Sequence, residues 1–241
     1  MTNLFGEFFG TMVLIIFGAG VVANCVLKKS KAEGGGWIVI TAGWAFGVIM
    51  GVFSAVATGA PQADLNPAVT LAKMMMGVYS LPHAIMTMFA ELAGGFAGGV
   101  IVWLAFLPHW EVTADKGAKL AVFCTGPAIR NTFANILCEI IGTVVLVVII
   151  FAIFSKPVGA LAPGFGPYLV GMLVWGIGLS LGGPTGYAIN PARDLGPRLA
   201  HAVLPIAGKG DSDWGYSWIP VVGPLIGGGL SYVIAKAIGL I

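Results

Sequence analysis

The 241-residue sequence is 58% hydrophobic and only 9% charged, and its formal net charge is +2. Soluble domains carry about 25% charged residues, so this composition excludes an ordinary soluble protein and predicts an integral membrane protein. The few charges form no basic or acidic block, and nucleic acid is therefore not an expected partner.

The cysteines and histidines do not predict a metal site. Three of each are scattered along the chain without the close spacing of metal ligands or redox pairs. No nucleophile paired with a base is visible in the sequence either. We therefore expect neither an enzyme nor a bound cofactor or metal.

Apolar stretches long enough to cross a membrane recur along the chain. A transmembrane helix needs about 20 apolar residues. Windows of this kind lie at about residues 4–27, 37–58, 82–107, 132–155, 165–183 and 217–240. The sequence therefore predicts an all-α integral membrane protein with six transmembrane helices.

Two shorter segments, at about residues 66–77 and 190–201, begin with the same three residues. These are Asn66-Pro67-Ala68 and Asn190-Pro191-Ala192. Asparagine is a favoured N-cap, and proline suits the first helical position, where its missing N–H would be unpaired anyway. A helix of a dozen residues rises about 18 Å, roughly half the thickness of a bilayer. Because broken helices at membrane depth must border protein or a cavity, these half-helices predict a pathway through the protein.

The order of these pieces repeats along the chain. The pattern Glu-x-x-Gly-Thr begins at Glu7 in the first span and at Glu139 in the fourth. Three spans per repeat is an odd number, so the second repeat must enter the membrane upside down. The sequence thus predicts one channel domain over residues 1–241, with inverted repeats at about 1–107 and 130–241 and the half-helices meeting near the midplane.

Two Asn-Pro-Ala half-helices in a six-span inverted repeat resemble the major intrinsic protein family, the aquaporins and glycerol facilitators. The resemblance covers essentially the whole chain. It implies a passive pore in each protomer, a homotetramer in the cell membrane, and cytoplasmic N- and C-termini. The Asn66 and Asn190 amides would donate to a passing oxygen, and the two helix N-termini, each with about half a positive charge, would repel cations.

The resemblance also implies where the pore is narrowest. Arg193 follows the second Asn-Pro-Ala within apolar sequence, and an arginine inside a membrane is a functional candidate. It resembles the arginine of the family's aromatic/arginine constriction, whose other walls would be Trp44, Gly178 and Tyr187. Water-selective members usually carry histidine at the position of Gly178. A glycine and two aromatic residues would leave a wider slot, which fits a polyol.

Four further charged residues are expected to have structural roles. Asp194 resembles the glycerol-facilitator branch of the family and would pair with Arg198 one helical turn later. Glu7 and Glu139 resemble the family glutamates that accept hydrogen bonds from the loops before the half-helices. An unpaired carboxylate inside the membrane would otherwise be costly.

Two positions depart from the family pattern. Asp64 stands where the family commonly has histidine, so we expect an acid at the pore mouth before the first Asn-Pro-Ala. Tyr187 stands where glycerol facilitators often have phenylalanine, which adds a hydroxyl to the constriction.

The basic residues predict a different orientation from the family. Those after the first and third spans are Lys28, Lys29, Lys31, Lys116, Lys119 and Arg130, and those on the other side are Lys73, Lys156 and Lys236. Counting them places the N-terminus outside the cell. We follow the resemblance, which places both termini in the cytoplasm, because it rests on the whole fold.

The leading hypothesis is a passive transmembrane channel for glycerol and other small uncharged solutes, with some water permeability. Other polyols and neutral lactic acid are further candidate solutes, and the lipid bilayer is the expected surrounding. A water-selective aquaporin is an alternative that Gly178 and Asp194 disfavour. An ion-coupled small-solute transporter also has inverted repeats and broken helices. It would need carboxylates facing the pathway, for which Glu7, Glu91 and Glu139 are the candidates.

Overall fold

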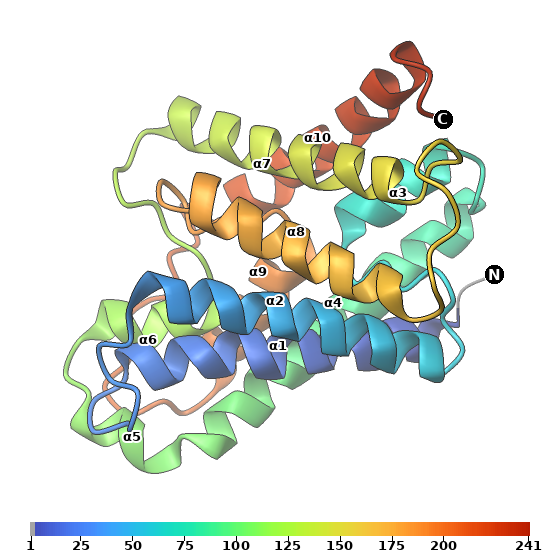
Figure 1. The fold of residues 1–241 in the computed structure, drawn as a ribbon. Coiled ribbons are helices and arrows are strands. Elements are labelled where there is room, and N and C mark those ends of the chain that lie inside the picture. Colours follow the sequence, from blue (N-terminus) through green and yellow to red (C-terminus); the bar gives the residue numbers. More distant parts are fainter. Residues whose placement is uncertain (1–2) are drawn as a thin grey trace.

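The protein is all-helical in the computed structural model, which describes residues 3–241 (Figure 1). These residues form ten α-helices and no strand. The long helices are α1 (Leu4–Val26), α2 (Gly36–Ala57), α4 (Leu81–Ala105), α7 (Thr132–Ile153), α8 (Phe165–Leu181) and α10 (Ile219–Ala237). Five of them are long and apolar enough to cross a membrane, and α8 is an apolar helix of 17 residues. The predicted spans are confirmed, with helix ends within about three residues of the predicted ones.

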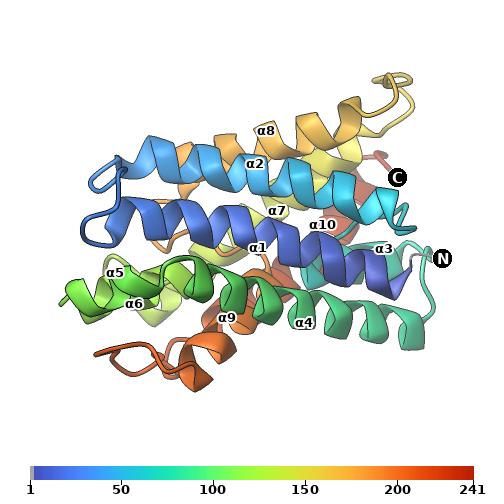
Figure 2. The ribbon, with the colours of Figure 1, turned by 90° about the horizontal axis from the view of Figure 1, so that it is seen from below.

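The two half-helices are α3 (Pro67–Met75) and α9 (Pro191–Val203). Each begins directly after its asparagine, whose side-chain oxygen accepts a hydrogen bond from the backbone N–H two residues later, at 2.9 Å in both cases. The start of α1, the end of α10 and helix α3 lie at one end of the molecule (Figure 1). The turned view places α5, α6 and the C-terminal part of α9 at the opposite end (Figure 2). The half-helices therefore reach the middle of the fold from opposite ends, as an inverted repeat requires.

Each half-helix packs on a glycine of a long helix from the other repeat. A Cβ atom placed on Gly95 of α4 would lie 2.5 Å from the carbonyl oxygen of Ala192, and one placed on Gly228 of α10 would lie 2.4 Å from that of Ala68. Side-chain atoms do not approach a backbone oxygen this closely. The two glycines therefore allow the half-helices to dock at backbone distance, as small residues do in membrane helix packing.

Two short helices fold within the segment 108–130, which the sequence predicts only as a link. They are α5 (Leu107–Val112) and α6 (Lys116–Phe123). Asp115 caps α6 by accepting from Ala118 N at 3.0 Å. Trp110 stacks on Phe123, with ring centroids 5.7 Å apart, and both side chains are buried. Helices of six and eight residues are too short for a clear apolar period, which is why the sequence does not reveal them.

Candidate functional site

The N-termini of the two half-helices are joined by their asparagine side chains. Asn66 Nδ2 donates to the carbonyl oxygen of Ile189 at 2.8 Å, and Asn190 Nδ2 donates to that of Leu65 at 2.7 Å. Each amide therefore bonds the loop of the opposite repeat. An amide NH2 group carries two hydrogens, so one hydrogen per asparagine stays available for a passing oxygen.

The loops that precede the half-helices adopt an unusual backbone conformation. Ala63 and Leu65 have φ values of 43° and 52°, and Tyr187 and Ile189, at the matching places in the second loop, have 39° and 44°. These are left-handed conformations of residues with a Cβ atom, which cost about 1–3 kcal/mol each. Other contacts must stabilise them.

Two buried glutamates supply those contacts. Glu7 on α1 accepts from Asp64 N at 3.2 Å and Leu65 N at 3.0 Å. Glu139 on α7 accepts from Ala188 N at 3.0 Å and Ile189 N at 2.8 Å. A carboxylate provides two acceptor oxygens in a fixed geometry, so each glutamate holds two consecutive backbone N–H groups that the bent loop would leave unpaired.

The arginine after the second Asn-Pro-Ala lies against a tryptophan. The Arg193 guanidinium carbon is 3.8 Å from the centroid of the Trp44 ring, within the range of a cation–π contact. Gly18 on α1 leaves room for this ring, because a Cβ there would lie 2.1 Å from Trp44 Cε3. Arg193 is buried, and its Nη1 atom has no hydrogen-bond partner among residues 3–241. The site thus holds a fixed positive charge with an unused donor.

The Tyr187 ring occupies the space left open by Gly178 on α8 and by Gly182, the C-cap of that helix. A Cβ on Gly178 would lie 2.8 Å from Tyr187 Cζ, and one on Gly182 would lie 2.5 Å from Tyr187 Cδ1. The Trp37 ring packs edge-to-face against the Tyr187 ring, with ring centroids 5.8 Å apart. Trp37 Nε1 donates to the Gly178 carbonyl oxygen at 2.9 Å. The geometry therefore places Gly178 behind the Tyr187 ring. Sequence reasoning missed Trp37 and Gly182; the four-residue spacing of the glycines was the available signal.

A cavity of about 900 Å³ extends from this constriction toward the end of the molecule where α3 ends. Trp44, Tyr187 and Arg193 line one end, and Lys156 and Leu240 line the other. The wall opposite the half-helix loops is formed by apolar side chains of α2, α7 and α8. They include Val48, Val52, Leu146, Ile150 and Val174. The passage therefore has an apolar side and a polar side.

Asp64 lines this cavity as a residue, but its carboxylate does not face it. The side chain has no exposed surface and forms an ion pair with Lys73 on α3. Tyr79 Oη donates to the carboxylate at 2.8 Å, and Thr70 Oγ1 lies 3.0 Å from it. Asp64 therefore belongs to the cavity lining but presents no exposed carboxylate to it. Lys73 neutralises the Asp64 carboxylate. The nine-residue spacing of the two residues does not reveal this pairing in the sequence.

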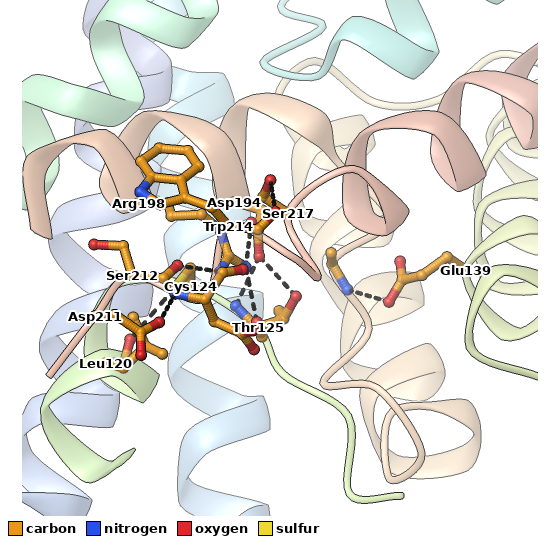
Figure 3. A network of polar contacts seen from close by, with 12 residues as sticks. Leu120, Cys124, Thr125, Glu139, Asp194, Arg198, Asp211, Ser212, Trp214 and Ser217 are labelled. Atoms are coloured by element: carbon orange, nitrogen blue, oxygen red, sulfur yellow. Dashed lines mark hydrogen bonds and ion pairs between the residues drawn. The ribbon is translucent and has the colours of Figure 1, made fainter. Parts of the chain in front are cut away.

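A second buried ion pair anchors α9 to two loops (Figure 3). Arg198 Nε donates to Asp194 at 2.8 Å, as the spacing predicts, and neither side chain has exposed surface. Asp194 also accepts from the backbone N–H and the hydroxyl of Thr125, both at 2.7 Å. Arg198 donates to the carbonyl oxygens of Thr125 at 2.9 Å and Ser212 at 2.8 Å. This network fixes the helix that carries Arg193.

The other end of α9 is capped by a lysine. Lys209 Nζ donates to the carbonyl oxygens of His201, Ala202 and Leu204 at 2.6–2.8 Å. A cation at a helix C-terminus interacts favourably with the helix dipole and satisfies its last carbonyls. Burial lowers the pKa of Lys209. The half-helix is therefore held at both of its ends.

Two half-helices that meet N-terminus to N-terminus, beside a narrowed cavity within six long apolar helices, define a membrane channel of the aquaporin type. Residues 1–234 match the family described as major intrinsic protein, and the chain belongs to this family.

Individual relatives cover nearly the whole chain. It is 56% identical over 228 residues to a probable glycerol uptake facilitator protein of Thermotoga maritima, covering 95% of each protein. It is 51% identical over 237 residues to a glycerol uptake facilitator protein of Bacillus subtilis, covering 98% of this chain and 85% of that protein. Its structure is similar to the X-ray structure of the aquaglyceroporin from Plasmodium falciparum, with a TM-score of 0.85 and 26% identity, covering 97% and 94% of the two chains.

Replacing Gly178 with alanine tests how the constriction is built. The added methyl group would overlap the Tyr187 ring and push it toward the passage. We expect glycerol permeability to fall by about tenfold, equivalent to about 1.4 kcal/mol on the barrier, with a smaller loss for water. Stopped-flow light scattering of proteoliposomes measures both. Gly176→Ala is the matched control, because a Cβ at Gly176 meets nothing within 4 Å. Equal glycerol-to-water ratios in the two variants would show that Gly178 does not set the position of Tyr187.

The Asp64–Lys73 pair can be tested through stability. Removing one partner of a buried ion pair leaves the other charge uncompensated, so Asp64→Asn should destabilise the protein by about 3 kcal/mol. The double variant with Lys73→Gln should recover part of this loss. Thermal unfolding in detergent provides the comparison, with Arg130→Gln as control because the Arg130 side chain of the Arg130–Asp213 pair is 66% exposed. An Asp64→Asn variant as stable as the control would contradict the pairing.

Proposed function

We propose that this protein is a passive transmembrane channel for glycerol and other small uncharged solutes, with some water permeability. The observation that carries the proposal is the slot lined by Trp44, Tyr187 and Arg193, which combines aromatic surface with a fixed positive charge. Arg193 Nη1 has no hydrogen-bond partner among residues 3–241. The names of the relatives, glycerol uptake facilitators, support the same solute.

A polyol suits such a slot because it also has two chemically different sides. Its hydroxyl groups lose hydrogen bonds to water on entry, which is costly unless the protein replaces them. Arg193 supplies a replacement, followed by the remaining amide hydrogens of Asn66 and Asn190. The C–H side of the molecule passes along Trp44 and the apolar wall of the cavity.

Two alternatives receive less support from the geometry. In a water-selective channel the position of Gly178 would be filled, whereas here Gly178 and Gly182 let the Tyr187 ring lie back against α8. An ion-coupled transporter would need carboxylates in the pathway. Glu7, Glu91 and Glu139 have no exposed surface.

We further propose a homotetramer in the cell membrane, with both termini in the cytoplasm, from membership of the family. The first described residues and the end of α10 lie at the same end of the molecule (Figure 1), which an even number of spans requires. Large apolar side chains lie exposed on the outer surface, such as Phe89 on α4 and Phe133 on α7, and we assign them to contact with lipid.

Reconstitution into liposomes tests the proposed function. Glycerol flux should be linear in its gradient, much faster than in protein-free liposomes, and insensitive to membrane potential and pH gradient. Stopped-flow measurements of glycerol, water and lactic acid on the same vesicles would rank the solutes. Accumulation of glycerol against its gradient would contradict passive transport. A glycerol flux equal to that of protein-free vesicles would contradict glycerol as the transported solute.

A further inference from the structure

The Thr70 hydroxyl lies between two carboxyl groups beside the first half-helix. Its oxygen is 3.0 Å from Asp64 Oδ2 and 2.9 Å from Glu91 Oε1. A hydroxyl has a single hydrogen to donate and accepts with its lone pairs. Thr70 can therefore donate to only one carboxyl group, and the other contact needs a proton that the carboxyl group itself carries.

The surroundings of Asp64 favour its ionised form. Its two oxygens face the Lys73 ammonium and the Tyr79 hydroxyl as well as Thr70. With three donors, one of them a cation, the carboxylate charge is well compensated. The proton therefore does not reside on Asp64.

The surroundings of Glu91 favour the neutral form. Its Oε1 atom accepts from Asn66 N at 3.0 Å, while its Oε2 atom is buried and has no partner among residues 3–241. No cation of the described chain bonds to Glu91, and the nearby charged groups are Glu7 on α1, Asp64 in the loop and Lys73 on α3. An uncompensated carboxylate oxygen in such a place is far more costly than a carbonyl oxygen.

We propose that Glu91 is a neutral carboxylic acid and a positioning residue for Asn66. Glu91 Oε1 carries the proton and donates it to Thr70, a lone pair of the same oxygen accepts the backbone N–H of Asn66, and Thr70 donates to the Asp64 carboxylate. This chain of hydrogen bonds uses every contact in the cluster and fixes the residue that starts α3. The assignment goes beyond the proposed function and does not depend on which solute passes.

Neutrality at this position has a consequence for the channel. Glu91 bonds the residue at the N-terminus of α3, where the helix dipole places about half a positive charge. This positive charge helps to keep cations out of the passage. An ionised Glu91 would offset it. Counted from the equivalent glycines Gly95 and Gly228, the corresponding position of α10 is Pro224. The second half-helix therefore has no acid there, and a neutral Glu91 keeps the two N-termini electrostatically similar.

Infrared difference spectroscopy on the whole protein in lipid tests the protonation state directly. Wild type at pH 7 should show the C=O stretching band of a buried protonated acid, and Glu91→Gln should lose it. The glutamine amide keeps the shape and the neutrality of the acid, and its carbonyl oxygen can take the place of Glu91 Oε1 as the acceptor of the Asn66 N–H. Glu111→Gln, at an exposed position on α5, is the control and should remove no such band.

A second variant tests the direction of the hydrogen bond. Thr70→Val removes the acceptor of the Glu91 proton, so the acid band should persist and shift to higher frequency. A band unchanged in Glu91→Gln would overturn the proposal. A band unshifted in Thr70→Val would show that Glu91 does not donate to Thr70.

Discussion

Two helices that begin in the middle of a membrane leave backbone N–H groups that lipid cannot satisfy, and the rest of this structure depends on how those groups are paired. Unpaired polar groups are too costly at this depth to be tolerated. Asn66 and Asn190 cap the helices with their oxygens and bond the opposite loop with their nitrogens. Glu7 and Glu139 hold the bent loops behind them. The pore is the space that remains beside these satisfied groups.

The two repeats meet the same requirement with different side chains. The first half-helix is tied to its own loop by Lys73 and Asp64 and to α4 by Glu91. The second is tied to distant loops by Asp194 and Arg198. In both repeats the acids are buried and bonded. The charge left beside the cavity is therefore positive, on Arg193, which suits an uncharged hydroxylated solute and disfavours cations.

Much of this fold can be predicted from the sequence, because two local features, apolar span length and helix capping, determine most helices in a membrane. Span length and the Asn-Pro-Ala repeat gave all six long helices and both half-helices, since apolar length and capping chemistry act locally. The burial of the Asp64 carboxylate could not be predicted, because it depends on a left-handed loop and on the ion pair with Lys73. The contact of Gly178 with the Tyr187 ring could not be predicted either, because it depends on how the loop places that ring. Contacts that depend on a bent backbone, or on the space left by a glycine, produce no pattern along the chain.

The central claim is that the half-helix N-termini, with their asparagine amides, keep cations out while uncharged solutes pass. Asn66→Asp tests it most directly, because aspartate retains the N-cap but replaces the Nδ2 donor with a negative charge. Asn131→Asp, at the N-cap of α7, is the matched control. Proton and sodium flux into dye-loaded proteoliposomes should stay at background in wild type and in the control, and rise in Asn66→Asp while glycerol still passes. A folded Asn66→Asp channel that passes glycerol and remains as tight to cations as wild type would contradict the account.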